Sequence, residues 1–174
     1  MDTERVWQLL ERGGVVRRVP SVVQQAGDQA AQPGWQPMKY ETLADPVGAD
    51  ELGRLLAERA RTLGADRLLI WEDPQDIALA HVVGRELEIP VVRSFNMDGL
   101  VGYSGSLPQG ARVLLLLDAV REPAPLRAMT ALVRQQGASV VGTAVLVETE
   151  ALVESGVATG EVVGLVSGRV DAQD

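Results

Sequence analysis

Apolar residues recur along this chain with two different periods, and the two periods alternate. The run 111–118, ARVLLLLD, is apolar on both faces, which is typical of a central strand in a parallel sheet. In the segment 49–63 the leucines follow the helical spacing instead, and Gly64 ends that pattern. Strands that alternate with helices predict an α/β fold, with a mainly parallel central sheet flanked by helices on both faces.

The predicted elements of this core follow one another through short connections. Strands are expected at 66–71, 90–95, 111–118, 139–147 and 161–166, and helices at 49–63, 75–88, 123–136 and 149–155. A glycine-containing loop is expected at 96–110, between the second and third of these strands.

The N-terminal part of the chain has a weaker pattern. Residues 3–12 predict a short helix, and residues 14–23 predict short paired strands. The polar, turn-rich stretch 24–37, QQAGDQAAQPGWQP, reads as a long loop. No internal repeat or linker divides the sequence, so we expect a single domain over 1–174. Its N-terminal helix and small lobe would span about 1–40, and its α/β core about 41–170.

Charge and composition argue against several classes of partner. The net charge of −8 argues against a general nucleic-acid binder, because neutralising phosphates needs a basic patch. No apolar run approaches the roughly 20 residues needed to cross a bilayer, and the N-terminal segment lacks a signal-peptide core. The chain has no cysteine. These features predict a cytoplasmic protein that binds neither nucleic acid nor membranes.

Parallel sheets bind ligands at the carboxyl ends of their strands, so three junctions carry the functional question. They are residues 71–76, 93–96 and 118–125. The candidate ligand-binding residues within them are Trp71, Asp73, Arg93, Ser94, Asp118 and Arg121.

These candidates also have structural interpretations, which stay open at this point. Asp118 could bind a ribose or a metal, or it could cap the turn that follows it. The acids Glu72, Asp73 and Asp76 could bind a divalent cation, or they could favour the helix that begins there through its dipole. Trp71 could stack on a base or fill space beside the pocket. No catalytic residue and no metal ligand is assigned.

Four segments of the chain carry a family pattern over roughly residues 40–150. They read LADPVGADELGRLLAERARTLGADRLLIW, DIALAHVVGRELEIPVV, ARVLLLLDAV and LRAMTALVRQQGASVVGTAVLVETE. In this order they resemble a type I phosphoribosyltransferase, and most of all orotate phosphoribosyltransferase. The resemblance implies a sugar-phosphate or nucleotide ligand and a homodimer. It also implies that the stretch 24–37 belongs to a small lobe, the hood, that covers the base.

The positions that bind phosphoribosyl pyrophosphate in this family are changed here. The resemblance implies two adjacent acids for the ribose hydroxyls, where this chain has Leu117 and Asp118. A Thr- and Gly-rich loop should then wrap the 5′-phosphate with N–H groups. The chain instead reads Arg121-Glu122-Pro123-Ala124-Pro125, in which each proline lacks an N–H.

Three further family features are also missing. The pyrophosphate loop after the first core strand is replaced by the acidic, glycine-free stretch 71–76. The mobile loop that carries catalytic lysines corresponds to 96–106, which has no Lys, Arg or His, and the sole lysine is the distant Lys39. The arginine that holds the orotate carboxylate is Thr149.

These departures predict a phosphoribosyltransferase fold with a decayed phosphoribosyl pyrophosphate site. We expect a non-catalytic or impaired binding or regulatory protein that weakly binds a nucleotide or sugar phosphate through Asp118 and Arg121. The alternative is an active, orotate-type phosphoribosyltransferase with an unusual phosphate loop, in which Arg93 and Arg121 replace main-chain donors. Only that alternative would need Mg²⁺.

Overall fold

The computed structural model describes residues 3–13, 16–19, 34–37, 44–149, 152, 156 and 160–167. Its helices are α1 (Thr3–Arg12), α2 (Pro46–Ala60), the 3-10 helix η1 (Arg61–Leu63), α3 (Pro74–Leu87) and α4 (Pro123–Gln135). Its strands are β1 (Val16–Val19), β2 (Gly34–Pro37), β3 (Arg67–Trp71), β4 (Val91–Met97), β5 (Leu100–Ser104), β6 (Arg112–Ala119), β7 (Ser139–Glu148) and β8 (Glu161–Ser167). The expected core strands are therefore present, as are the helices expected at 49–63, 75–88 and 123–136, with small shifts at their ends.

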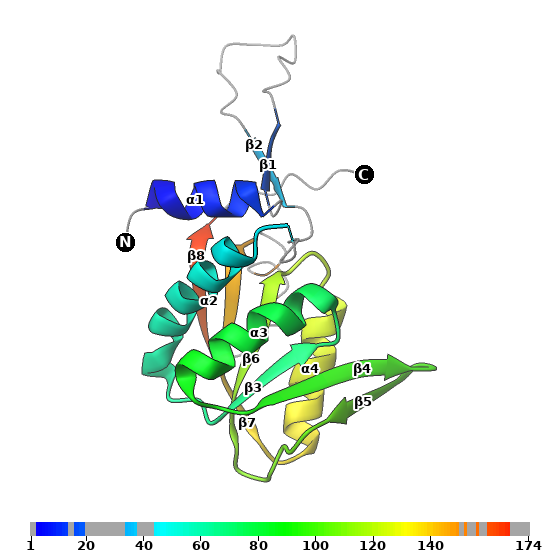
Figure 1. Ribbon diagram of the computed structural model, residues 1–174. Coiled ribbons are helices and arrows are strands. Elements are labelled where there is room, and N and C mark those ends of the chain that lie inside the picture. The colour runs from blue at the N-terminus through cyan, green and yellow to red at the C-terminus, as the bar shows by residue number, and fades with distance from the viewer. Residues whose placement is uncertain are drawn as a thin grey trace.

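Six strands form the central sheet in the order β5-β4-β3-β6-β7-β8 (Figure 1). The strands pair in parallel except for β5, which runs antiparallel to β4 at one edge. Strand β6 lies inside the sheet between β3 and β7, as its doubly apolar sequence predicts. The predicted α/β class, with a mainly parallel sheet, is confirmed.

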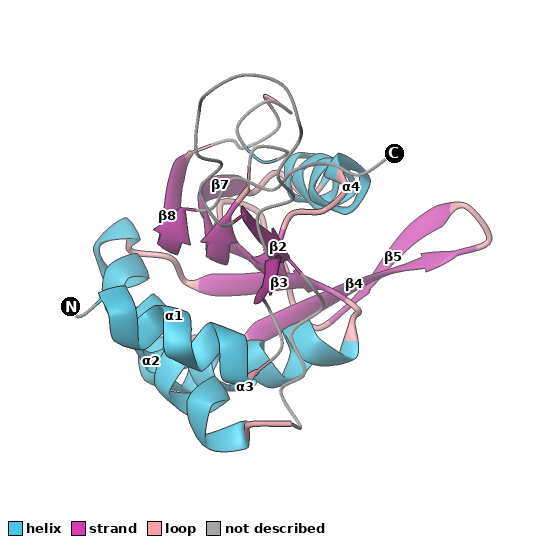
Figure 2. Ribbon diagram, turned by 90° about the horizontal axis from the view of Figure 1, so that it is seen from above, coloured by secondary structure: helices cyan, strands magenta, loops and turns pink. Residues whose placement is uncertain are grey.

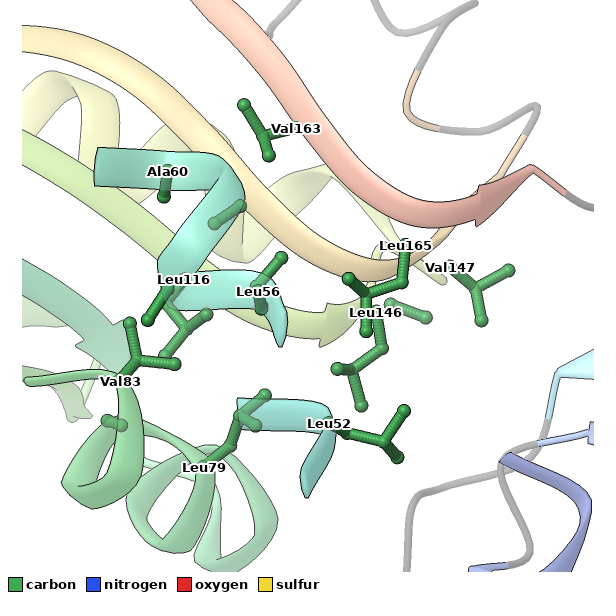
Figure 3. Packing of buried hydrophobic residues seen from close by; sticks show 14 of the residues in the cluster. Leu52, Leu56, Ala60, Leu79, Val83, Leu116, Leu146, Val147, Val163 and Leu165 are labelled. Carbon is green, nitrogen blue, oxygen red and sulfur yellow. The ribbon is translucent and has the colours of Figure 1, made fainter. Parts of the chain in front are cut away.

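Helices cover both faces of this sheet (Figure 2). Helices α1, α2 and α3 pack on one face, where side chains of α2, α3 and the sheet form one core (Figure 3). Helix α4 packs on the other face over a second core. Strand β6 supplies both: Leu114 and Leu116 point into the first core, and Leu115 and Leu117 into the second.

Helices α2, α3 and α4 each begin with a proline directly after a residue whose backbone is not helical. Asp45 caps α2 by accepting a hydrogen bond from the N–H of Gly48, and Asp73 caps α3 by accepting one from Gln75. Glu122 precedes α4 without a side-chain cap. Proline suits the first helical position, because its N–H would have no partner there. None of these helix starts requires a bound ligand.

The prediction of a loop at 96–110 is wrong for the first half of that segment. Strands β4 and β5 form a hairpin closed by Asp98 and Gly99, both of which have positive φ angles, 50° and 86°. Two such central residues form the turn that matches the twist of paired strands, and Asp-Gly is its common sequence. The hairpin extends beyond the body of the sheet (Figure 1).

The N-terminal prediction also changes. Strand β1 pairs antiparallel with β2 rather than within residues 14–23, so the last four residues of the expected loop 24–37 form a strand. Residues 24–33 lie outside the described part of the chain, as does most of the helix expected at 149–155. None of the helices among the described residues is long and apolar enough to span a bilayer.

The hairpin turn yields a direct test. A Cβ added at Gly99 would meet nothing within 4 Å, so Gly99→Ala changes only the backbone preference. We expect it to cost about 1 kcal/mol, because alanine tolerates positive φ poorly. The loss should appear as faster hydrogen exchange of β4 and β5 amides, with β6 unchanged. Gly99→Asn, which tolerates this conformation better, should exchange more slowly than Gly99→Ala; equal exchange in both variants would contradict the turn assignment.

Candidate functional site

The carboxylate of Asp118 lies at the end of β6 and is bound by groups of its own chain. Only 4% of this residue is exposed. Its Oδ1 accepts hydrogen bonds from the N–H of Ala119 at 2.6 Å and from Nη1 of Arg121 at 2.9 Å. Its Oδ2 accepts one from Nη2 of Arg121 at 2.8 Å. Arg121 therefore binds both oxygens in a bidentate, two-pronged ion pair, which is the strongest common geometry for an arginine–carboxylate contact.

The charge of Arg121 is stabilised by this pairing. Its side chain is 31% exposed. Partial burial acts to lower the pKa of Arg121, but the hydrogen bonds to Asp118 and the charges of Asp118, Asp76 and Asp73 outweigh it, and the pKa is raised. The guanidinium thus remains a fixed cation beside the strand end.

A second buried acid, Asp76, joins α3 to the same strand end. It lies in the first turn of α3 and is 5% exposed, and its Oδ1 accepts a hydrogen bond from the backbone N–H of Asp118 at 2.9 Å. Burial raises the pKa of Asp76 to about 8, and the charges of Asp118 and Asp73 act in the same direction. Two buried carboxylates at one strand end thus share the site with one arginine, and Asp76 is neutral at pH 7.

The loop that follows β6 offers few donors for an anion. Pro123 and Pro125 stand at the first and third positions of α4, so Ala124 has the one N–H among those three positions. Glu122, directly before the helix, is exposed. A helix start of this composition is poorly suited to wrapping a phosphate.

Asp73 and Trp71 occupy structural positions in this fold. Asp73 is the N-cap of α3. Trp71 is half-buried and packs against the core beneath α4. The acids Glu72, Asp73 and Asp76 do not form a metal site: within the described ranges, no three His, Cys, Asp or Glu side chains are placed to hold a metal ion.

Ser94 and Arg93 do not meet Asp118 and Arg121 in a common cluster. Ser94 is fully buried, and its hydroxyl donates to the carbonyl of Ile70 at 2.7 Å. Nη1 of Arg93 donates to Glu72 at 3.2 Å in an exposed ion pair. Of the six candidate residues, Asp118 and Arg121 are joined by a side-chain ion pair. Trp71 contacts two others through the main chain: it pairs with Ser94 between β3 and β4, and its carbonyl accepts the N–H of Asp73 at 2.8 Å.

Thr149 ties the end of β7 to the segment after β6. This residue is 2% exposed, and its hydroxyl donates to the carbonyl of Val120 at 2.7 Å and accepts from the N–H of Leu152 at 3.3 Å. The position where the family resemblance implies an arginine therefore supports the main chain beside Asp118. The sequence analysis did not predict that Asp76 accepts a hydrogen bond at this site. The available signal was its position three residues after Asp73, the N-cap of α3.

The chain is similar in sequence to adenine phosphoribosyltransferases and in structure to solved adenine and orotate phosphoribosyltransferases. No family model matches the chain. It is 32% identical over 126 residues to the adenine phosphoribosyltransferase of Xanthomonas oryzae pv. oryzae (strain PXO99A). The match covers 72% of this chain and 62% of the relative, so the chain spans less than two thirds of the relative's length.

Solved structures of adenine and orotate phosphoribosyltransferases share the fold. The adenine phosphoribosyltransferase of Rhodothermus marinus superposes with a TM-score of 0.65 at 18% identity, covering 91% of this chain and 97% of that one. The orotate phosphoribosyltransferase of Aeropyrum pernix superposes with a TM-score of 0.66 at 18% identity, covering 92% of each chain. The predicted resemblance is confirmed at the level of the fold.

The raised pKa of Asp76 predicts how stability depends on pH. The unfolded carboxyl has a pKa near 4, so between pH 5 and 8 the folded protein holds a proton that the unfolded chain has released. The free energy of unfolding should therefore fall as pH rises through this window, by a few kcal/mol.

Asp76→Asn should abolish this part of the decline, since the amide does not titrate and its oxygen still accepts the N–H of Asp118. Urea unfolding at pH 5 and pH 8 measures the difference. The exposed Asp98→Asn is the matched control and should keep the wild-type decline. Parallel curves for wild type and Asp76→Asn would contradict the buried-acid assignment.

Proposed function

We propose that this chain, which has the type I phosphoribosyltransferase fold, is a non-catalytic or strongly impaired binding or regulatory protein. In this proposal Arg121 takes the place that the ribose of a substrate would take on Asp118. The observation that carries the proposal is the two-pronged pair, with N–O distances of 2.8 and 2.9 Å on the two oxygens of Asp118.

A sugar hydroxyl has to compete with a charge already in place. Neutral hydroxyls form weaker hydrogen bonds to a carboxylate than a guanidinium does, because the ionic donor adds charge attraction. Arg121 is tethered three residues away, so it binds without the loss of freedom that a separate ligand incurs on association. We therefore expect sugar phosphates to bind only weakly to the wild-type protein.

The loop itself weakens phosphate binding further. Charge-assisted hydrogen bonds contribute roughly 1.5–3 kcal/mol each, and two donors are absent at Pro123 and Pro125. Their loss, about 3–6 kcal/mol together, corresponds to roughly a hundredfold to ten-thousandfold in affinity for a phosphate. In addition, the segment of β4 and β5 that matches the catalytic lysine loop has no lysine.

Catalysis provides the first test. Purified protein mixed with phosphoribosyl pyrophosphate, Mg²⁺ and either adenine or orotate should form no nucleotide above background. The reason is that the start of α4 lacks the N–H groups replaced by Pro123 and Pro125, and the segment 96–106 has no lysine to assist the leaving pyrophosphate. The Xanthomonas adenine phosphoribosyltransferase serves as the positive control for the adenine reaction. Turnover at ordinary enzyme rates, of order 1–1,000 s⁻¹, would overturn the proposal in favour of an active enzyme with an unusual phosphate loop.

Binding provides the second test, by restoration of the loop. The combined variant Arg121→Thr, Glu122→Thr, Pro123→Gly, Ala124→Gly and Pro125→Thr frees Asp118 and restores the N–H donors. Calorimetry should detect ribose 5-phosphate binding to this variant and about a thousandfold weaker or undetectable binding to wild type. Arg121→Ala alone separates the two causes: it frees Asp118 but keeps both prolines, so it should recover less affinity than the full variant. Equal affinity in wild type and the full variant would show that the loop is not the determinant.

A further inference from the structure

A cavity of about 240 Å³ lies at the β8 edge of the sheet. Its lining comes from α1, from α2 and from the carboxyl-terminal parts of β7 and β8, and it includes Trp7, Arg59, Glu148, Gly164 and Leu165. Neither Asp118 nor Arg121 lines it. Helix α1 contacts β8 at this edge (Figure 1). The cavity is smaller than the roughly 300–1,000 Å³ of sites for drug-sized molecules, so it suits a small metabolite.

One acid in this cavity, Glu148, has no partner among the described residues. The Glu148 side chain is half-buried, and its carboxylate makes no hydrogen bond or ion pair with any residue in the described part of the chain. It lies directly over Gly164 of the neighbouring strand: a Cβ at that position would fall 2.6 Å from Oε1 of Glu148. The glycine thus leaves the space that Glu148 occupies. A half-buried charge of this kind is stabilised by a cationic partner.

A cation lines the same cavity. Nη1 of Arg59 donates to the carbonyl of Gly164 and, at 3.4 Å, to the carbonyl of Leu165. These bonds anchor the guanidinium on β8 by one nitrogen, and within the described residues Nε and Nη2 have no partner. None of the ion pairs between described residues joins Arg59 to Glu148. The cavity therefore presents a separate donor for an anion and a separate acceptor for a cation.

We propose that this cavity binds a small zwitterion, a free α-amino acid. Its carboxylate is held by the remaining N–H groups of Arg59, which suit a planar carboxylate. Its ammonium is held by Glu148, and the Trp7 ring lies among the lining residues as an additional surface for a cation. The proposal does not depend on the proposed function, because it uses no residue of the Asp118 site.

The test is a titration with defined probes. Each of the common free L-α-amino acids is screened by thermal shift, and those that stabilise the protein are titrated by calorimetry. Acetate and methylammonium, which carry one half of the zwitterion each, are titrated in parallel. We expect saturable binding of at least one amino acid and at least tenfold weaker binding of both half-ligands, because each half-ligand engages only one of the two charged groups.

Variants locate the binding. Glu148→Gln keeps the shape of the side chain and removes its charge, and should weaken amino-acid binding at least tenfold. Glu161→Gln, an exposed glutamate at the other end of β8, is the matched control and should bind like wild type. In wild type, the bound amino acid should slow hydrogen exchange of the 164–167 amides, a readout that stands even if Glu148→Gln folds poorly. Absence of saturable binding by every amino acid, undiminished binding to Glu148→Gln, or unchanged exchange at 164–167 would each overturn the proposal.

Discussion

The carboxylate of Asp118 stands at the end of a strand that is buried on both faces, and a buried charge needs partners. Strand β6 has hydrophobic cores above and below it, so water cannot solvate an acid at its end from either face. Neighbouring residues of the same chain supply these partners: the N–H of Ala119 and both terminal nitrogens of Arg121 donate hydrogen bonds to the carboxylate. Removing one member of such a pair would leave an uncompensated charge, which costs far more than the pair contributes.

The surrounding segments are arranged around this charge. Asp76 accepts the N–H of Asp118 and, as a neutral acid at pH 7, adds no second charge to the strand end. The hydroxyl of Thr149 donates a hydrogen bond to the carbonyl of Val120, so a residue at the end of β7 also stabilises the turn after β6. Helix α4 then starts on proline without a ligand. The strand–loop–helix frame is thus complete within the chain itself, which is why we propose that its ligand role has been lost.

Much of the fold could be predicted from the sequence because burial imposes a pattern on every residue of a central strand. The run Val113–Leu117 requires two covered faces, and that requirement places β6 inside the sheet. The β4–β5 hairpin was missed although Asp98-Gly99 is a strong turn signal. Strand β4 was predicted at 90–95, but β5 has no buried residue, so its segment was interpreted as a loop. The pairing of β1 with β2 depends on a contact across some fifteen residues of sequence that no local pattern encodes.

The candidate site was harder to predict than the fold. The changed loop could be identified from its prolines, but the sequence could not reveal that Arg121 turns back onto Asp118 rather than toward solvent or a ligand. Asp76 appeared as one of three clustered acids, and only the packing of α3 against β6 turns it into a buried acceptor. Arg93 and Ser94 were expected at a strand end where ligands bind, but they lie within β4, and their side chains contact Glu72 and Ile70.

The central claim is that Arg121 binds the carboxylate of Asp118 in place of a ligand. The most direct test is a crystal structure of the protein crystallised with millimolar ribose 5-phosphate. We expect the two-pronged pair to keep its distances of 2.8 and 2.9 Å and no phosphate to lie over residues 121–126. A ribose on Asp118, with Arg121 swung away or bound to the 5′-phosphate, would contradict it.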